Sequence, residues 1–205
     1  MKLVFISDTH SLHDSISIPD GDVFIHCGDF LGNNSWQKLE EFNAFLGSLK
    51  HQTKIVIAGN HDGLFEKETK EAIKVLTNAN YLQDSSITIQ GIKFYGSPWT
   101  PVFFDWFFMA ESEELKPYWE KIPSDVDVLI THGPPNGIHD RTVDGVNAGC
   151  PELLKRVTEL NPKIHAFGHI HEGYGVTEIN GSKFINASSL DENYRAVNAA
   201  VVVEI

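Results

Sequence analysis

The stretch Lys54–Asp62, KIVIAGNHD, places three polar residues directly after a run of β-forming residues. The run Ile55–Ile57 is typical of a buried strand, and Gly59 ends it before Asn60–Asp62. In open α/β sheets the carboxyl ends of the strands form the edge at which ligands bind. We therefore expect at least one of these three side chains to contact a substrate or a metal.

The same arrangement recurs at four other places in the chain. Apolar runs at residues 3–7, 23–27, 126–131 and 164–167 each end in residues that can bind a metal. The polar residues after the five runs are Asp8 and His10, Asp29, Asn60, His61 and Asp62, His132, and His169 and His171. One such Asp or His usually caps a turn or helix. Five strand ends of the same kind make coincidence a poor explanation.

A pair of divalent cations about 3.5–4 Å apart needs a bridging carboxylate, further nitrogen and oxygen ligands, and room for a bridging water. The residues that supply this set are Asp8, His10, Asp29, Asn60, His132, His169 and His171. Because none of them is a thiolate, Mn²⁺ or Fe is favoured, and Zn²⁺, Co²⁺ and Ni²⁺ are compatible. The sequence thus predicts two divalent metal ions.

Between these runs the apolar spacing predicts helices and hairpins. Helices are expected at Ser35–Leu49 with Asn34 or Ser35 as N-cap, at Glu66–Leu76 with Ala72, Ile73 and Leu76 facing inward, at Glu113–Ile122 despite Pro117, and at Pro151–Leu160. Hairpins are expected around Gln90-Gly91 and Asn180-Gly181, and a last strand at Ala199–Ile205.

Composition limits the function classes. The chain has 205 residues, which fits one domain spanning residues 1–205, and a formal charge of −12 that would repel long nucleic acid. No segment reaches transmembrane length and the amino terminus is too weakly apolar for a secretory signal, so we expect a cytoplasmic protein. Cys27 and Cys150 are expected to stay reduced there.

The motifs resemble those of a known superfamily. The order Asp8-x-His10, Gly28-Asp29, Gly59-Asn60-His61-Asp62, Thr131-His132-Gly133 and Gly168-His169-Ile170-His171 resembles the calcineurin-like metallophosphoesterases. Four longer stretches are similar to the metallophosphoesterase-domain-containing branch, which is associated with class III cyclic-nucleotide-type phosphodiesterases: YGSPW at 95–99, THGPP at 131–135, GHIHEGYG at 168–175 and INAS at 185–188. The resemblance implies an α/β fold, a four-layer α-β-β-α sandwich of two mixed β-sheets.

The resemblance also implies roles for individual residues. One metal would be held by Asp8, His10, Asp29 and His171, and the other by Asp29, Asn60, His132 and His169. Asp29 would bridge the pair, and a hydroxide between the metals would attack phosphorus. His61 would protonate the departing alkoxide as general acid, and Asp62 would orient His61.

The arginine content bears on which ester is cleaved. Related Ser/Thr protein phosphatases hold a phosphate dianion with arginines, one of them shortly after the Gly-Asp motif, but residues 28–33 here contain none. The only arginines are Arg141, Arg156 and Arg195, of which Arg141 is a candidate for reaching the site. A small phosphodiester, including a cyclic nucleotide, is therefore the favoured substrate. The alternatives are a phosphomonoesterase of the same fold and a non-catalytic interaction scaffold.

The sequence also leads to predictions for several residues outside the five motifs. The aromatic patch Phe103–Phe108 has rings that could stack on a base, but it is rather expected to pack a core or to cover a neighbouring chain, as in a homo-oligomer. Trp99 is expected near a nucleotide, and His13 at the rim of the site. Cys150 and Arg156 match the C-x5-R pattern of cysteine-dependent phosphatases, but the residues between them are typical of a helix, not of a phosphate-binding loop.

Overall fold

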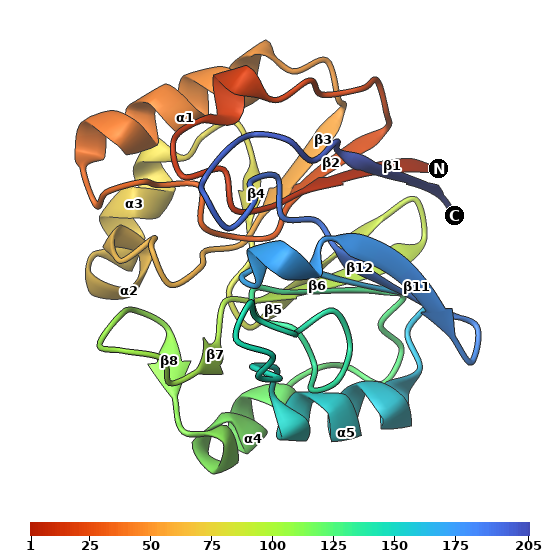
Figure 1. Ribbon diagram of the computed structural model, residues 1–205. Helices are drawn as coiled ribbons and strands as arrows, with labels where there is room; N and C mark the ends of the chain where they lie inside the picture. Colours follow the sequence, from red (N-terminus) through yellow and green to blue (C-terminus); the bar gives the residue numbers. More distant parts are fainter.

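Two β-sheets lie against each other in the computed structural model, which describes residues 1–205 (Figure 1). The first sheet has the order β13-β1-β2-β3-β4 and the second β11-β12-β10-β9-β6-β5. The first comprises β1 (Lys2–Ile6), β2 (Val23–His26), β3 (Thr53–Val56), β4 (Asn80–Tyr81) and β13 (Val201–Glu204). The second comprises β5 (Ser85–Ile89), β6 (Ile92–Ser97), β9 (Val128–Thr131), β10 (Ile164–Phe167), β11 (Gly175–Ile179) and β12 (Ser182–Asn186).

Alternate side chains of the central strands enter different apolar cores. In β1, Leu3 and Phe5 join the cluster between the two sheets, together with Ile130 of β9 and Ala166 of β10. Val4, the residue between them, faces the opposite way into a second cluster. Because successive strand residues point to opposite faces, a run that is apolar throughout indicates a strand buried on both sides.

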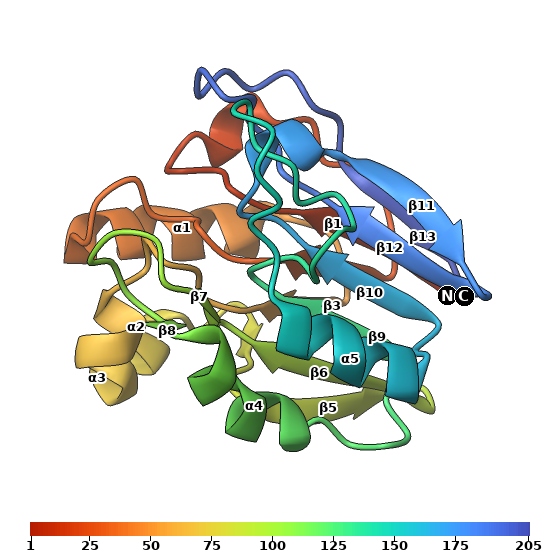
Figure 2. The same ribbon diagram turned by 60° about the horizontal axis from the view of Figure 1, so that its bottom comes forward.

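Helices cover the outer face of each sheet and complete four layers (Figure 2). The first sheet is covered by α1 (Trp36–Ser48), α2 (Leu64–Lys67) and α3 (Thr69–Val75), and the second by α4 (Ser112–Glu120) and α5 (Pro151–Leu160). Short elements fill the connections: η1 (His13–Ser15), η2 (His171–Gly173), β7 (Thr100–Pro101) and β8 (Met109–Ala110). The predicted α/β fold with two mixed sheets is confirmed.

Most predicted elements form, but the helix expected at Glu66–Leu76 is wrong in detail. The chain makes two helices, α2 and α3, which meet at Glu68 with φ −133° and ψ 43°. Phe65 of α2 and Ala72 of α3 both enter the same apolar cluster, and Leu76 joins it as predicted. Ile73, predicted to face inward, is 44% exposed because α3 does not continue the periodicity of α2.

Parallel pairing brings the strand ends of the predicted site together. β1, β2 and β3 are parallel neighbours in one sheet, and β6, β9, β10 and β12 are parallel neighbours in the other. The loops after β1, β2, β3, β9 and β10 carry the motifs with Asp and His. No helix is both long and apolar enough to cross a membrane.

Candidate metal centre

The structure brings all seven predicted metal ligands to one edge of the two sheets. Asp8 and His10 follow β1, Asp29 follows β2 and Asn60 follows β3, whereas His132 follows β9 and His169 and His171 follow β10. Ligand atoms of Asp8, His10 and His171 lie within 4.8 Å of one another, and so do those of Asp8, Asp29 and His132. Ligand atoms of His10, Asp29 and His61 form a third such group, so Asp8, His10 and Asp29 each belong to two of the three overlapping groups.

Asp29 lies between histidines from both sheets. Its Oδ2 is 3.8 Å from His10 Nε2 and 3.4 Å from His132 Nε2. On the far side, His132 Nε2 is 2.8 Å from Asn60 Oδ1, and the His132 ring lies 5.0 Å from that of His169. This position between two sets of nitrogen ligands is the one that a bridging carboxylate needs.

Two histidines are oriented by carbonyl groups behind them. His132 Nδ1 lies 3.0 Å from the Cys27 carbonyl oxygen, and His171 Nδ1 lies 3.0 Å from the Asp191 carbonyl oxygen. In the neutral form of each imidazole, a proton on Nδ1 leaves Nε2 with a free lone pair directed toward the carboxylates. Asp191 was not predicted from the sequence, and no local motif marks it.

Asp8 is held in place by two donors. The His169 amide lies 3.0 Å from its Oδ2, and the Ser188 hydroxyl donates to the same oxygen at 2.8 Å. Ser188 belongs to the INAS stretch, whose sequence alone does not indicate this contact. These contacts leave Asp8 Oδ1 facing His171 Nε2 at 3.8 Å.

The glycines that precede the ligands are required because atoms of other residues lie where a side chain would begin. A Cβ on Gly59 would lie 2.3 Å from Asp29 Oδ1, and a Cβ on Gly168 would lie 2.1 Å from Asp8 Oδ2. At Gly28 a Cβ would lie 2.6 Å from His132 Nδ1, and the residue has a φ of +100°. The Gly-Asp, Gly-Asn and Gly-His pairs of the motifs therefore have a steric cause.

The ligand positions also have strained backbones. Asp8, His10, Asp29 and His169 adopt φ angles of 52°, 42°, 57° and 68°. Residues other than glycine reach this left-handed region at a cost of about 1–3 kcal/mol each, and such strain gathers at functional sites. Here four of the seven predicted ligands have this conformation.

The electrostatics of the cluster match the needs of bound cations. Burial lowers the pKa of His132, but the carboxylates of Asp29 and Asp8 outweigh it and raise the pKa to about 9. Burial alone would raise the pKa of Asp29, yet His132 and His10 hold it below its usual range. His10 Nε2 and Asn60 Nδ2 are buried without a hydrogen-bond partner. Buried carboxylates, neutral donors and an unpaired imidazole nitrogen fit divalent metal ions.

His61 is placed beside this cluster. Its amide donates to Asp29 Oδ1 at 2.7 Å, which fixes its backbone. Its ring lies 4.8 Å from the ring of His10 and 4.1 Å from that of Trp106. The imidazole therefore borders both the potential ligands and the aromatic segment.

Asp62 does not make the contact expected of it. Its carboxylate accepts hydrogen bonds from the amides of Asp29 and Gly59, both at 2.8 Å, and of Leu31 at 2.9 Å. None of its hydrogen bonds goes to the His61 ring. Burial and the negative charge of Asp29 raise the pKa of Asp62 well above its usual range. Asp62 thus ties together the loops that carry Asp29 and Asn60.

A cavity of about 530 Å³ opens over the potential ligands. Its floor includes His10, Asp29, Asn60, His61 and His171. Its walls come from the segment 101–106, the loop 142–148, and the loop with Glu192 and Tyr194. The Tyr194 ring lies 5.0 Å from that of His10 and 5.2 Å from that of His171. The sequence favoured packing over base stacking for the segment that contains Trp106, and no local pattern indicated that Tyr194 would line the site.

Three residues expected near the site do not line the cavity. Trp99 does not line the cavity, since its indole donates to Asp84 at 3.2 Å and packs on Phe108 and Tyr118. His13 is buried against Phe42 and Phe45, away from the rim. Arg141 is exposed and is not among the residues that line the cavity.

The C-x5-R pattern has no phosphate-binding loop. Cys150 is the N-cap of α5, and its sulfur accepts from the Leu153 amide at 3.4 Å. Burial raises the pKa of its thiol. Arg156 donates to the carbonyl oxygens of Trp119 and Ile122. The pair is structural, as the helical pattern between the two residues had indicated.

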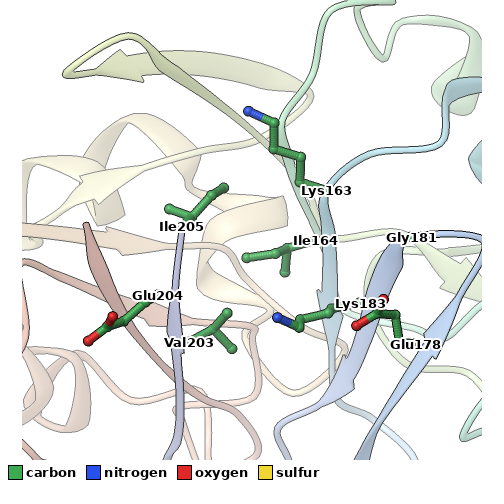
Figure 3. Close-up of a pocket in the computed structure, with 8 residues that line it drawn as sticks. All are labelled: Lys163, Ile164, Glu178, Gly181, Lys183, Val203, Glu204 and Ile205. Atoms are coloured by element: carbon green, nitrogen blue, oxygen red, sulfur yellow. The ribbon is translucent and has the colours of Figure 1, made fainter.

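A second, smaller cavity of about 190 Å³ lies at the opposite ends of the strands (Figure 3). Residues of β10, β11, β12 and β13 and of the adjoining segments line it near the carboxyl terminus, among them Lys163, Lys183 and Glu204. It contains none of the residues with metal-binding chemistry predicted from the sequence. The larger cavity is therefore the candidate site.

Comparisons with known proteins agree with this geometry. Residues 1–173 match the calcineurin-like phosphoesterase family. The whole chain aligns with metallophosphoesterase domain-containing protein 1 of Homo sapiens at 41% identity, covering 71% of that protein, and the Mus musculus protein gives the same values. The structure of TT1561 from Thermus thermophilus has a TM-score of 0.63 at 14% identity, over 90% of this chain and 88% of that one. Because the family match covers most of the sequence, the protein belongs to the calcineurin-like phosphoesterase family.

Proposed function

We propose that this protein hydrolyses small phosphodiesters with the help of two divalent metal ions. The observation that carries the proposal is the convergence of seven nitrogen and oxygen ligands from five strand ends beneath one cavity. A site with this donor set and a cavity open to solvent can bind both the metals and a phosphoryl group.

The proposed metal ligands divide into two sets that share Asp29. Asp8, His10, Asp29 and His171 would hold one ion, and Asp29, Asn60, His132 and His169 the other. The bound ions would supply positive charge for the phosphoryl oxygens and lower the pKa of water. The absence of a thiolate ligand favours Mn²⁺ or Fe.

His61 is the proposed proton donor to the leaving alkoxide. The hydrogen bond from its amide to Asp29 Oδ1, 2.7 Å long, couples its position to a proposed bridging ligand. Its ring lines the cavity, so a departing oxygen above the ligands would be within its reach. A donor placed in this way contributes roughly 10²–10⁴-fold to the rate of a proton-transfer step.

The charge of the cavity favours a diester over a monoester. None of the residues that line it is a lysine or arginine. A phosphomonoester dianion would find no cationic side chain in addition to the metals, whereas a diester carries a single negative charge. Cyclic nucleotides meet this requirement and are within the proposed substrate class.

A substrate screen tests the proposal. Protein stripped with a chelator and reloaded with Mn²⁺ would be assayed with bis-p-nitrophenyl phosphate, p-nitrophenyl phosphate, and 3′,5′- and 2′,3′-cyclic nucleotides. We expect diesters to be cleaved faster than the monoester, and activity to disappear when the metal is removed. Faster cleavage of the monoester would instead identify a phosphomonoesterase. Stoichiometric metal binding without hydrolysis of any ester would identify an interaction scaffold.

A further inference from the structure

We propose that Trp106 binds the alcohol arm that leaves during hydrolysis, and that this arm is a flat or apolar group without a second phosphate. The inference rests on the proposed function, since it assumes that His61 protonates the leaving oxygen. It goes further by naming which arm of the diester is recognised and by which side chain.

The contact between Trp106 and His61 carries the inference. Their ring centroids lie 4.1 Å apart at an interplanar angle of 63°. His61 also contacts His10, with ring centroids 4.8 Å apart. The oxygen that receives a proton from His61 must lie within hydrogen-bonding distance of the imidazole. The carbon attached to that oxygen is then beside Trp106, which lines the same cavity and is 39% exposed.

The position of Trp106 is fixed by its neighbours. The Phe107 amide donates to the Asn60 carbonyl oxygen at 3.3 Å, and the Phe108 amide donates to Glu66 Oε1 at 2.8 Å. Phe108 is buried, and the Phe107 ring packs so closely on Gly63 that a Cβ there would lie 2.3 Å from it. The aromatic segment is thus attached to the same turn that carries Asn60 and His61.

The remaining rings of the segment leave an open apolar wall. Phe103 is 54% exposed, lines the cavity, and has its ring centroid 6.3 Å from that of Trp106. Core packing therefore accounts for Phe107 and Phe108 but not for Phe103 and Trp106. Aromatic faces beside a site bind flat or apolar groups through burial and ring stacking.

Charge excludes a phosphorylated arm. Besides Asp29, the cavity is lined by the carboxylates of Asp144, Glu172 and Glu192, and by no lysine or arginine. The Glu172 carboxylate accepts a hydrogen bond from the Val143 amide at 3.1 Å, which holds it at the wall. A second phosphate on the substrate would meet these carboxylates with no lysine or arginine to compensate their charge.

Methyl benzyl phosphate tests which arm leaves. Water adds its oxygen to phosphorus in either cleavage: one breaks the bond to the benzyl oxygen and releases benzyl alcohol with methyl phosphate, and the other releases methanol with benzyl phosphate. In each, the leaving oxygen takes up one proton. The two alcohols have similar acidity, so the product ratio, measured by NMR, reports how the arms are bound.

We expect benzyl alcohol to exceed methanol by roughly three- to tenfold, the range that aromatic contacts of this kind provide. The variant Trp106→Leu should bring the ratio close to one. Phe104→Leu is the matched control, because Phe104 belongs to the same segment, is 70% exposed and does not line the cavity. The ratio is independent of metal loading and of the fraction of folded enzyme. An unchanged ratio in Trp106→Leu would overturn the inference.

A second comparison tests the charge argument. Methyl ethyl phosphate and methyl 2-phosphonoethyl phosphate differ by one anionic group on the departing arm. We expect the phosphonate ester to be cleaved at least about tenfold more slowly than methyl ethyl phosphate. The variant Glu192→Gln should reduce this difference between the two cleavage rates. Equal rates for the two esters would refute the exclusion of a phosphorylated arm.

A binding measurement separates this inference from the proposed function. Titration of the Mn²⁺-loaded protein with methyl benzyl phosphate should change tryptophan fluorescence in the wild type but not in Trp106→Leu. If no diester is hydrolysed yet this difference is seen, the proposed function fails and the binding role of Trp106 stands. If the wild type and Trp106→Leu respond alike, the role of Trp106 fails whatever the activity.

Discussion

The backbone amide of Asp29 donates a hydrogen bond of 2.8 Å to the carboxylate of Asp62. The same carboxylate accepts the amides of Gly59 and Leu31, so that one buried side chain fastens the loops after β2 and β3 to each other. Asp62 therefore ties together the backbone around the candidate metal centre, and its carboxylate makes no hydrogen bond to the His61 ring.

Asp62→Ala should be strongly destabilising. It leaves three buried amides without an acceptor, and each unsatisfied group costs about 1–3 kcal/mol. We expect the free energy of unfolding to fall by about 3 kcal/mol or more in urea denaturation of the metal-free protein, and by less in Asp62→Asn, which keeps one acceptor oxygen. If Asp62→Ala instead kept full stability and altered only the pH profile of activity, a role in orienting His61 would be restored.

Gly59→Ala should weaken metal binding. The added methyl group would lie 2.3 Å from Asp29 Oδ1 and 2.6 Å from His132 Cε1, so both proposed ligands must move. We expect Mn²⁺ affinity, measured by calorimetry, to fall at least about tenfold. Gly181→Ala serves as control, because its φ of +83° is strained for alanine but no atom lies within 4 Å. The control should lose about 1–2 kcal/mol of stability and keep its metal affinity.

Asn60→Ala and His61→Ala should have different effects although they are adjacent. Asn60→Ala removes a proposed ligand, so metal content measured by mass spectrometry should fall. His61→Ala should retain both metals and lower kcat for diesters with poor leaving groups by roughly 10²–10⁴-fold. A His61 ligand atom lies within 4.8 Å of those of His10 and Asp29, so the measurement also tests direct ligation. Equal loss of metal in both variants would contradict the proposed division of roles.

Asp191→Ala should weaken metal binding although Asp191 is not a proposed ligand. The Asp191 carbonyl oxygen lies 3.0 Å from His171 Nδ1, while its carboxylate accepts from the Asn193 amide at 3.0 Å and from the Arg195 amide at 2.8 Å. Without the carboxylate the loop loses these bonds and His171 loses its fixed orientation. We expect metal affinity to fall about 10-fold or more. Arg195→Ala removes only an exposed partner and should change metal affinity little.

Buried His165 should make the protein sensitive to acid. Burial lowers its pKa to about 3, whereas an unfolded chain would bind a proton near pH 6.5. Between these values the unfolded state holds one more proton, so stability falls as pH decreases from about 6.5 to about 3 by roughly 1.4 kcal/mol per pH unit. Glutamine cannot titrate, so the free energy of unfolding of His165→Gln, measured by urea denaturation, should fall with decreasing pH less steeply than that of the wild type. The difference between the two slopes should be that amount. An unchanged slope between pH 6 and 4 would show that His165 is already protonated in the fold.

The sequence determined much of this protein through local patterns. The run Ile55–Ile57 followed by Asn60–Asp62 indicates a strand buried on both faces with polar residues at its end, because strand periodicity and apolar burial are local properties. Repetition of that pattern at five places predicted the residues that gather at the candidate metal centre. Parallel pairing then requires the strand ends to meet, as they do after β1, β2 and β3.

Only the tertiary structure decided which side chains support and surround these residues. Asp62 follows His61 in sequence, yet its carboxylate bonds the amide of Asp29 on another loop. Trp106, not Trp99, lies beside His61, because the Phe107 amide is fastened to the Asn60 carbonyl group. Asp191 reaches His171 from a loop 20 residues away in sequence. Such contacts depend on how loops close over the sheet edge, and that closure is set by hydrogen bonds between distant segments rather than by local residue preference.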